Sequence, residues 1–169
     1  VRALRAEKYF EDNTNHTYLF DIYPYPYQQE ILDKLNAERE IRGHYRNLVI
    51  AATGTGKTVI SAFDYKRFRN RNKEKPCRLL FVAHRQEILE QSLDCFRGVL
   101  KDPNFGSLFV GNYRPDDIDH LFVSIQTFNS QSLYEKTSTD FYDFIIVDEF
   151  HHAAAPSYEK LLSYYKPKV

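Results

Sequence analysis

The sequence predicts an α/β domain with a mainly parallel sheet and helices on both of its faces. Its 169 residues correspond to a single domain. Four short apolar runs are continuous rather than alternating, which is typical of strands buried on both faces of a parallel sheet. They are Leu48–Ala52, Leu79–Ala83, Leu121–Ile125 and Phe144–Val147. Helical patterns lie between these runs, so right-handed crossover connections would place helices on both faces of the sheet.

The composition is that of an ordinary globular chain. Hydrophobic residues make up 43% and charged residues 27%, which argues against wholesale disorder. Lys+Arg and Asp+Glu number 23 each, so the net charge neither predicts nor excludes a nucleic-acid partner. No apolar run approaches the length of about 18 residues that a membrane span needs. Two cysteines, Cys77 and Cys95, exclude a disulfide scaffold, so we expect buried thiols and a cytoplasmic location.

The start of the sequence differs from the rest. Residues 1–22 are polar and irregular, so we expect an N-terminal extension there. Residues 23–169 are expected to form the domain, truncated before its C-terminal end, and the absence of methionine indicates a module of a longer protein. A helix is predicted from about Tyr27 to Ile41, because apolar residues recur at helical spacing and Gly43 follows them.

Two more helices and one weaker strand are predicted further along the chain. Ile60, Phe63 and Phe68 indicate a helix after the first apolar run. A clean apolar stripe indicates another, which a proline at position 103 ends. The stripe consists of Leu89, Leu93, Phe96 and Leu100. Ser107–Val110 is a weaker apolar run that would add a strand.

A glycine-containing loop joins the first predicted strand to the next helix. It reads Ala-Ala-Thr-Gly-Thr-Gly-Lys-Thr over residues 51–58. A polyphosphate needs converging backbone N–H groups, and glycines let the backbone turn and approach closely. We expect ATP to bind here, with Lys57 on the β- and γ-phosphates and the Thr58 hydroxyl on Mg²⁺. The binding residues would be Thr53, Gly54, Thr55, Gly56, Lys57 and Thr58.

Two acids follow the last apolar run, at Asp148 and Glu149. An acid at the tip of a buried strand, in a chain with a phosphate loop, can hold Mg²⁺ through its waters. A second acid beside it can orient and deprotonate the water that attacks the γ-phosphate. We therefore predict catalytic roles for Lys57, Asp148 and Glu149, with Thr58 and Asp148 at the metal. A zinc site is disfavoured, because the cysteines lack the C-x-x-C spacing.

Together these segments resemble the first RecA-like domain of superfamily 2 helicases and translocases, a three-layer P-loop NTPase fold. Tyr27-Gln28 looks like the adenine-reading glutamine motif, although Tyr25 replaces its usual arginine. Residues 51–58 look like motif I, and Asp148-Glu149-Phe150-His151 looks like a DExH-type motif II. Two further strand ends match weaker motifs: Val82-Ala83-His84-Arg85 and Ser124-Ile125-Gln126-Thr127-Phe128. The finer resemblance is to type III and type I restriction-enzyme helicase subunits.

The resemblance implies a DNA- or RNA-tracking motor that uses ATP and Mg²⁺. His84, Arg85, Gln126 and Thr127 would contact the nucleic-acid backbone without sequence specificity, and His151 would couple the two activities. The family's catalytic arginine comes from a second RecA-like domain that this sequence lacks. We therefore expect residues 1–169 alone to hydrolyse ATP at barely detectable rates. No nuclease signature of an acid, any residue and lysine follows Pro115-Asp116.

Other interpretations remain open from the sequence. A different P-loop enzyme, such as a small-molecule kinase, is disfavoured by the Tyr27-Gln28 pair. An ATP-switched or degenerate nucleic-acid-binding module is a further alternative. The basic segment Lys66–Arg78 could contact DNA, but a helix end with an exposed loop is the more common explanation.

Overall fold

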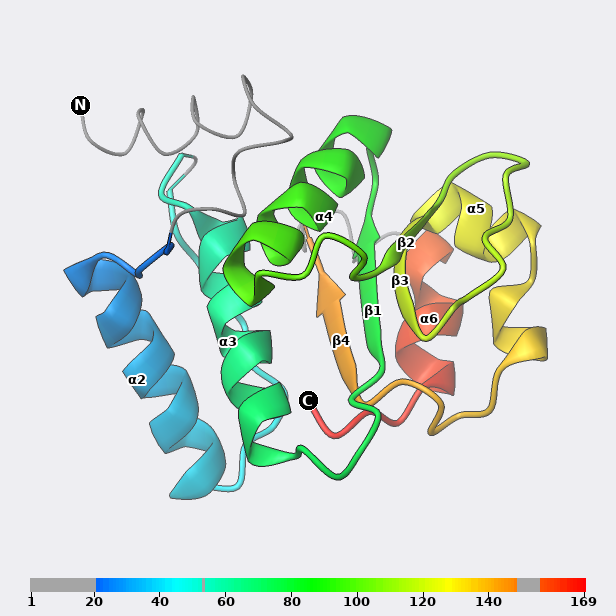
Figure 1. The fold of residues 1–169 in the computed structure, drawn as a ribbon. Coiled ribbons are helices and arrows are strands. Elements are labelled where there is room, and N and C mark those ends of the chain that lie inside the picture. The colour runs from blue at the N-terminus through cyan, green and yellow to red at the C-terminus, as the bar shows by residue number, and fades with distance from the viewer. Residues whose placement is uncertain (1–20, 53, 149–155) are drawn as a thin grey trace. The chain divides into compact units, whose positions relative to one another are not determined.

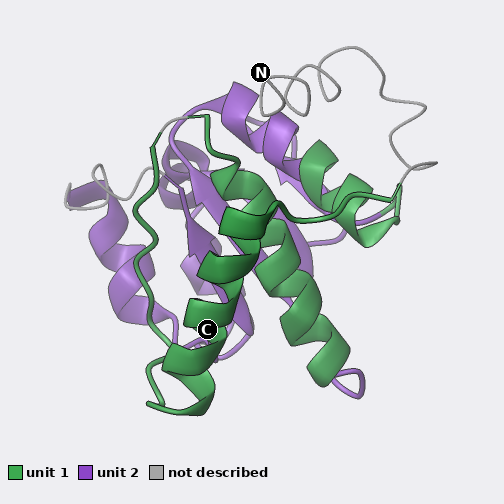
Figure 2. Cartoon of the chain, turned by 90° about the vertical axis from the view of Figure 1, so that its left-hand side faces the viewer, with its two compact units in different colours: residues 1–71, 94–104 green, residues 72–93, 105–169 purple. Residues whose placement is uncertain are grey.

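The computed structural model describes residues 21–52, 54–148 and 156–169. The chain divides into two compact units (Figure 2). The first unit comprises residues 1–71 and 94–104, and the second comprises residues 72–93 and 105–169. Among the described residues, no helix is long and apolar enough to cross a membrane.

The first unit contains two helices that lie side by side, α2 (Pro26–Glu40) and α3 (Lys57–Arg71) (Figure 1). Both predicted helices are therefore confirmed. Proline at the first position suits α2, because its missing N–H has no partner there in any case. The helix ends before Gly43, whose left-handed φ of 69° lets its N–H reach the Arg39 carbonyl (3.0 Å).

The second unit is built on a four-stranded, all-parallel sheet in the order β2-β3-β1-β4. The strands are β1 (Leu79–Ala83), β2 (Ser107–Phe109), β3 (His120–Ser124) and β4 (Phe144–Val147). Each predicted run after residue 70 thus forms a strand, including the weak one. All five residues of β1 are buried, as expected for a central strand of a sheet that is covered on both faces.

Helices cover both faces of this sheet. On one face, Leu80, Val82, Leu121 and Val123 belong to a core formed with the elements that follow β3 and β4. Those elements are α5 (Ile125–Ser130), η2 (Leu133–Lys136), η4 (Pro156–Tyr158) and α6 (Glu159–Tyr164).

The opposite face carries Phe81 stacked on Phe122, with ring centroids 5.2 Å apart. There, Leu93 of α4 (Gln86–Leu100) lies close to Phe122 across Gly106. A Cβ on Gly106 would lie 2.9 Å from the Leu93 side chain, so only glycine permits this approach. The predicted α/β class with helices on both faces is confirmed.

Two sequence predictions are wrong: one predicted strand is absent, and one strand ends earlier than expected. Leu48–Ala52 is not a strand of the sheet, and Leu48 and Ile50 are 59% and 86% exposed. The outer edge of β4 bonds to Val169: the Val169 N–H donates to the Asp143 carbonyl (3.1 Å), and the Ile145 N–H donates to the Val169 carbonyl (2.9 Å).

The second wrong prediction is the end of a strand: the sequence predicts that Ile125 ends it, but Ile125 begins α5. The Ser124 hydroxyl accepts the Thr127 N–H (3.1 Å) and so starts the helix one residue early.

Candidate functional site

The predicted phosphate loop contains two glycines in the left-handed backbone region. Gly54 and Gly56 adopt left-handed φ values of 80° and 75°. The loop runs directly into α3, whose first helical hydrogen bond joins Ile60 N–H to the Gly56 carbonyl (3.0 Å). The N–H groups of the preceding first turn therefore lack partners within the helix, and this turn begins with the exposed Lys57. An open helix N-terminus with a nearby lysine suits an anion such as a nucleotide phosphate.

Gln28 connects the start of α2 to this loop. Its side chain is 2% exposed, and its Oε1 accepts the Tyr25 N–H (2.9 Å). Its Nε2 donates to the Thr55 carbonyl (3.3 Å), and the Tyr27 hydroxyl donates to the same carbonyl. A Cβ on Gly56 would lie only 2.5 Å from Nε2. The predicted adenine-reading glutamine is thus packed directly on the phosphate loop.

The tyrosines around the glutamine are arranged as a stack. The Tyr25 and Tyr27 rings are nearly parallel, 9° apart, with centroids separated by 6.1 Å. Tyr27 remains 41% exposed beside the loop that its hydroxyl contacts. An exposed aromatic face at this position can stack on a flat heterocycle.

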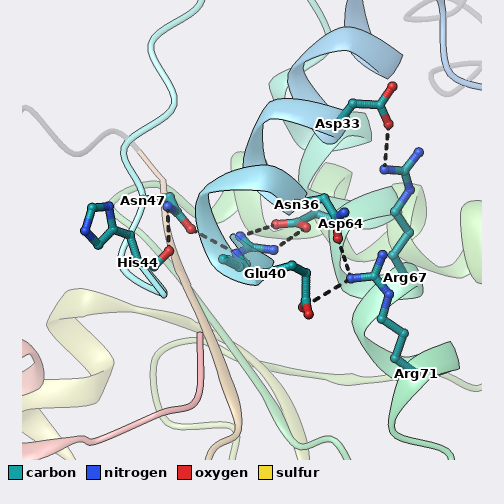
Figure 3. A network of polar contacts seen from close by, with 9 residues as sticks. Asp33, Asn36, Glu40, His44, Asn47, Asp64, Arg67 and Arg71 are labelled. Carbon is teal, nitrogen blue, oxygen red and sulfur yellow. Dashed lines mark hydrogen bonds and ion pairs between the residues drawn. The ribbon is translucent and has the colours of Figure 1, made fainter. Parts of the chain in front are cut away.

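A polar network between α2 and α3 was not predicted from the sequence (Figure 3). Arg39 forms a bidentate ion pair with Asp64, through bonds of 2.6 and 2.8 Å. Its Nε also donates to Asn47 Oδ1 (2.9 Å), in the segment that leads to the phosphate loop. The sequence signal for a buried acid here is Asp64 itself, because it lies at helical spacing between Ile60 and Phe68, although it does not specify the partner. An acid among apolar positions needs a cationic partner.

In the second unit, polar residues follow the carboxyl ends of three adjacent strands. His84 follows β1, Gln126 comes after β3, and Asp148 follows β4. Because the strands are parallel, these ends lie at one edge of the sheet. Gln126 Nε2 lies 3.2 Å from His84 Nδ1, so the structure brings two of the predicted nucleic-acid residues together. The Asp148 N–H donates to the Val82 carbonyl (2.9 Å), which fixes the acid beside the end of β1.

Thr127 and Arg85 differ in exposure. Arg85 is exposed directly before α4. Thr127 is 4% exposed, and its Oγ1 accepts the Gly111 N–H (3.0 Å) and bonds to Ser124 Oγ (2.8 Å). Its hydroxyl therefore holds the loop after β2 against α5. Nucleic-acid contact at either residue stays a prediction, and the predicted residues Thr53, Glu149 and His151 lie outside the described part of the chain.

The basic segment Lys66–Arg78 contributes to internal ion pairs. Arg67 pairs with Asp33 (3.3 Å), and Arg71 lies 3.6 Å from Glu40. Arg78 pairs with Asp119 (3.0 Å) and lies over the Phe141 ring. These contacts favour the interpretation of this segment as a helix end with its loop.

Both cysteines are buried as thiols, and the Cys77 thiol donates to the Asn72 carbonyl (3.3 Å). Burial, together with the nearby Asp94 charge, raises the pKa of the Cys95 thiol to about 12. A thiol that stays protonated is neither a nucleophile nor a metal ligand at neutral pH. Cys95 therefore has a packing role, as the sequence predicted.

The comparison with known families agrees with this arrangement. Residues 21–169 match the family described as "Type III restriction enzyme, res subunit". The chain belongs to this family. The match includes the phosphate loop, the tyrosine-glutamine pair and all four strands.

Individual relatives carry helicase and restriction-enzyme names. The chain is 31% identical over 146 residues to "Putative ATP-dependent helicase IRC3" of Saccharomyces cerevisiae, covering 83% of this chain and 20% of that protein. It is 32% identical over 143 residues to "Putative mitochondrial ATP-dependent helicase irc3" of Schizosaccharomyces pombe, covering 83% and 23%. It is 24% identical over 179 residues to "Type I restriction enzyme EcoAI endonuclease subunit" of Escherichia coli, covering 95% and 19%. The chain thus spans about a fifth of the length of these relatives.

Proposed function

We propose that this chain is the ATP-binding motor domain of an ATP-dependent DNA helicase or translocase. The observation that carries the proposal is the junction of a phosphate loop with a buried, base-reading glutamine. Gln28 packs on the Thr55 carbonyl, while the loop presents the N-terminus of α3 and Lys57. A kinase for small molecules needs no such glutamine. The names of the relatives support ATP use and a nucleic-acid substrate.

Each residue of the proposed site has a distinct role. Lys57 places its charge on the β- and γ-phosphates, and the N–H groups of the first turn of α3 bind the phosphate oxygens. Thr58 and Asp148 would hold Mg²⁺, which offsets negative charge on the phosphates when it is bound. Glu149 orients the attacking water and accepts its proton. Tyr27 stacks on the adenine ring that Gln28 reads.

The sheet edge that carries His84 and Gln126 is the proposed nucleic-acid side. The side chains of both residues are exposed and bonded to each other, so they present a polar surface suited to phosphate oxygens. Arg85 adds a positive charge next to His84. Contacts of this kind give salt-dependent affinity without sequence specificity.

We also propose that ATP turnover depends on a second RecA-like domain. Charge on the transferring phosphoryl group is usually stabilised by an arginine worth about 10³–10⁵ in rate. In the family that this sequence resembles, that arginine lies in the second domain. We therefore propose that residues 1–169 bind nucleotide but need the second domain for turnover. Cytoplasmic location remains a prediction, and one relative is named as mitochondrial.

The test measures ATP hydrolysis with and without DNA, using a longer protein that carries both RecA-like domains. The expected result is a rate that DNA increases and that Glu149→Gln lowers about a hundredfold, while Mg²⁺·ATP binding remains. A rate that ignores DNA would indicate another P-loop enzyme. DNA binding without faster hydrolysis would indicate an ATP-switched or degenerate module. Stimulation by RNA but not by DNA would indicate that RNA is the nucleic-acid substrate.

A further inference from the structure

The two helices that carry the proposed nucleotide site run in the same direction. Contacts join the two starts and the two ends of the helices (Figure 1): Gln28 meets Thr55, and Glu40 lies 3.6 Å from Arg71. Their N-termini therefore lie at the same end, where Gln28 of α2 contacts Thr55 just before α3. The spacing between Gln28 and the phosphate loop thus depends on the register of α2 against α3. A slip of one helical turn would move Gln28 by about 5.4 Å.

One contact is suited to fix this register. The Arg39–Asp64 side chains are 11% and 12% exposed, and both guanidinium NH groups engage the carboxylate. A planar fork bonded at two points specifies position and angle, which a single-point contact does not. Arg39 Nε also bonds to Asn47, and Asn47 Nδ2 bonds to the His44 carbonyl (3.1 Å). The same guanidinium therefore holds the chain that leads into the phosphate loop.

The same helix pair contains a natural control. Asp33 and Arg67 also join α2 to α3, but their side chains are 64% and 31% exposed and meet at one contact of 3.3 Å. Exposed pairs of this kind contribute little, about 0–1 kcal/mol. The buried fork and the exposed pair thus differ in burial and geometry while linking the same two elements.

We propose that Arg39 and Asp64 are positioning residues that hold Gln28 against the phosphate loop and so set the preference for adenine over other bases. This inference rests on the proposed function, because it assumes that the loop binds nucleotide and that Gln28 reads the base. Neither residue touches the nucleotide in this account; both act through the register of α2 and α3. Their loss therefore weakens base discrimination more than phosphate binding.

The experiment compares three ligands by calorimetry: Mg²⁺·ATP, Mg²⁺·ITP and inorganic tripolyphosphate. The wild-type chain is expected to prefer ATP to ITP. Asp64→Asn should reduce that preference about tenfold, the equivalent of one well-placed hydrogen bond, with less than about a twofold change for tripolyphosphate. Asp33→Asn should match the wild type with all three ligands. Circular dichroism and thermal melting establish that each variant is folded.

The outcomes separate this inference from the proposed function. If the wild type binds none of the three ligands, the proposed function and this inference both fail. If it binds ATP and ITP equally, or if folded Asp64→Asn keeps the full preference, only the positioning role is overturned. Should Asp64→Asn not fold, Arg39→Lys decides, because lysine keeps the charge but not the two-point geometry. A full ATP preference in Arg39→Lys would contradict the inference, and a reduced one would support it.

Discussion

Two apolar runs of five residues, Leu48–Ala52 and Leu79–Ala83, have similar sequences and different surroundings. The second forms β1, bonded to β3 on one side and β4 on the other, and every one of its residues is buried. The first is not a strand of the sheet and leaves Leu48 and Ile50 exposed. The difference lies in the neighbours, because a continuous apolar run is buried on both faces only within a sheet that helices cover on each side. The local pattern predicts a tendency, and the tertiary partners decide the outcome.

The largest expected effect comes from applying one substitution to both runs. Leu80→Ala removes a fully buried side chain from the core of the second unit and should lower the free energy of unfolding by about 3–5 kcal/mol. Leu48→Ala, at a side chain that is 59% exposed, should change it by no more than about 0.5 kcal/mol. Urea unfolding of both variants measures the contrast. Equal losses would show that Leu48 is buried in solution and that its run pairs as a strand.

Gly56 and Gly43 extend the contrast to glycines with the same left-handed backbone. Gly43→Ala should cost about 1–2 kcal/mol from φ alone, because nothing lies within 4 Å of the added Cβ. Gly56→Ala carries the same backbone cost. In addition, the new Cβ would lie 2.5 Å from Gln28 Nε2 and would push that side chain away. It should therefore be the less stable variant in thermal melts and the one that loses ATP affinity. Loss of ATP affinity in Gly43→Ala would contradict the placement of the site.

The smallest expected effect on stability concerns Cys95. It compares the same thiol in the folded and in the unfolded chain. Burial raises the pKa of this thiol from 9.0 to about 12. The protonated thiol thus contributes stability that is complete below pH 9 and is lost as the pH rises toward 12. At pH 8 the native chain should react with iodoacetamide far more slowly than the denatured chain, as peptide mass mapping would show. Equal labelling rates would mean that this thiol is accessible in the folded state.

Much of the fold and part of the site could be predicted from the sequence. Apolar runs indicated β1, β3 and β4, because strands buried on both faces need apolar residues at every position. Gly-Lys-Thr after an apolar run predicts a phosphate loop, and the structure has two left-handed glycines followed directly by α3 at these positions.

The contact between Arg39 and Asp64 could not be predicted, since 25 residues separate them and nothing local specifies which arginine meets the acid. The hydrogen bonds between Val169 and the outer edge of β4 likewise depend on which segments meet in three dimensions.

We propose above all that this chain binds adenine nucleotide through the loop at the start of α3. Titration of the chain with Mg²⁺·ATP by calorimetry, for the wild type and for Lys57→Ala, tests it most directly. We predict weak but saturable binding by the wild type and at least a tenfold loss in the variant, with unchanged circular dichroism. Lys57 is exposed, so its removal should not affect folding. Equal ATP affinity in the folded variant, or no binding by the wild type, would contradict the claim.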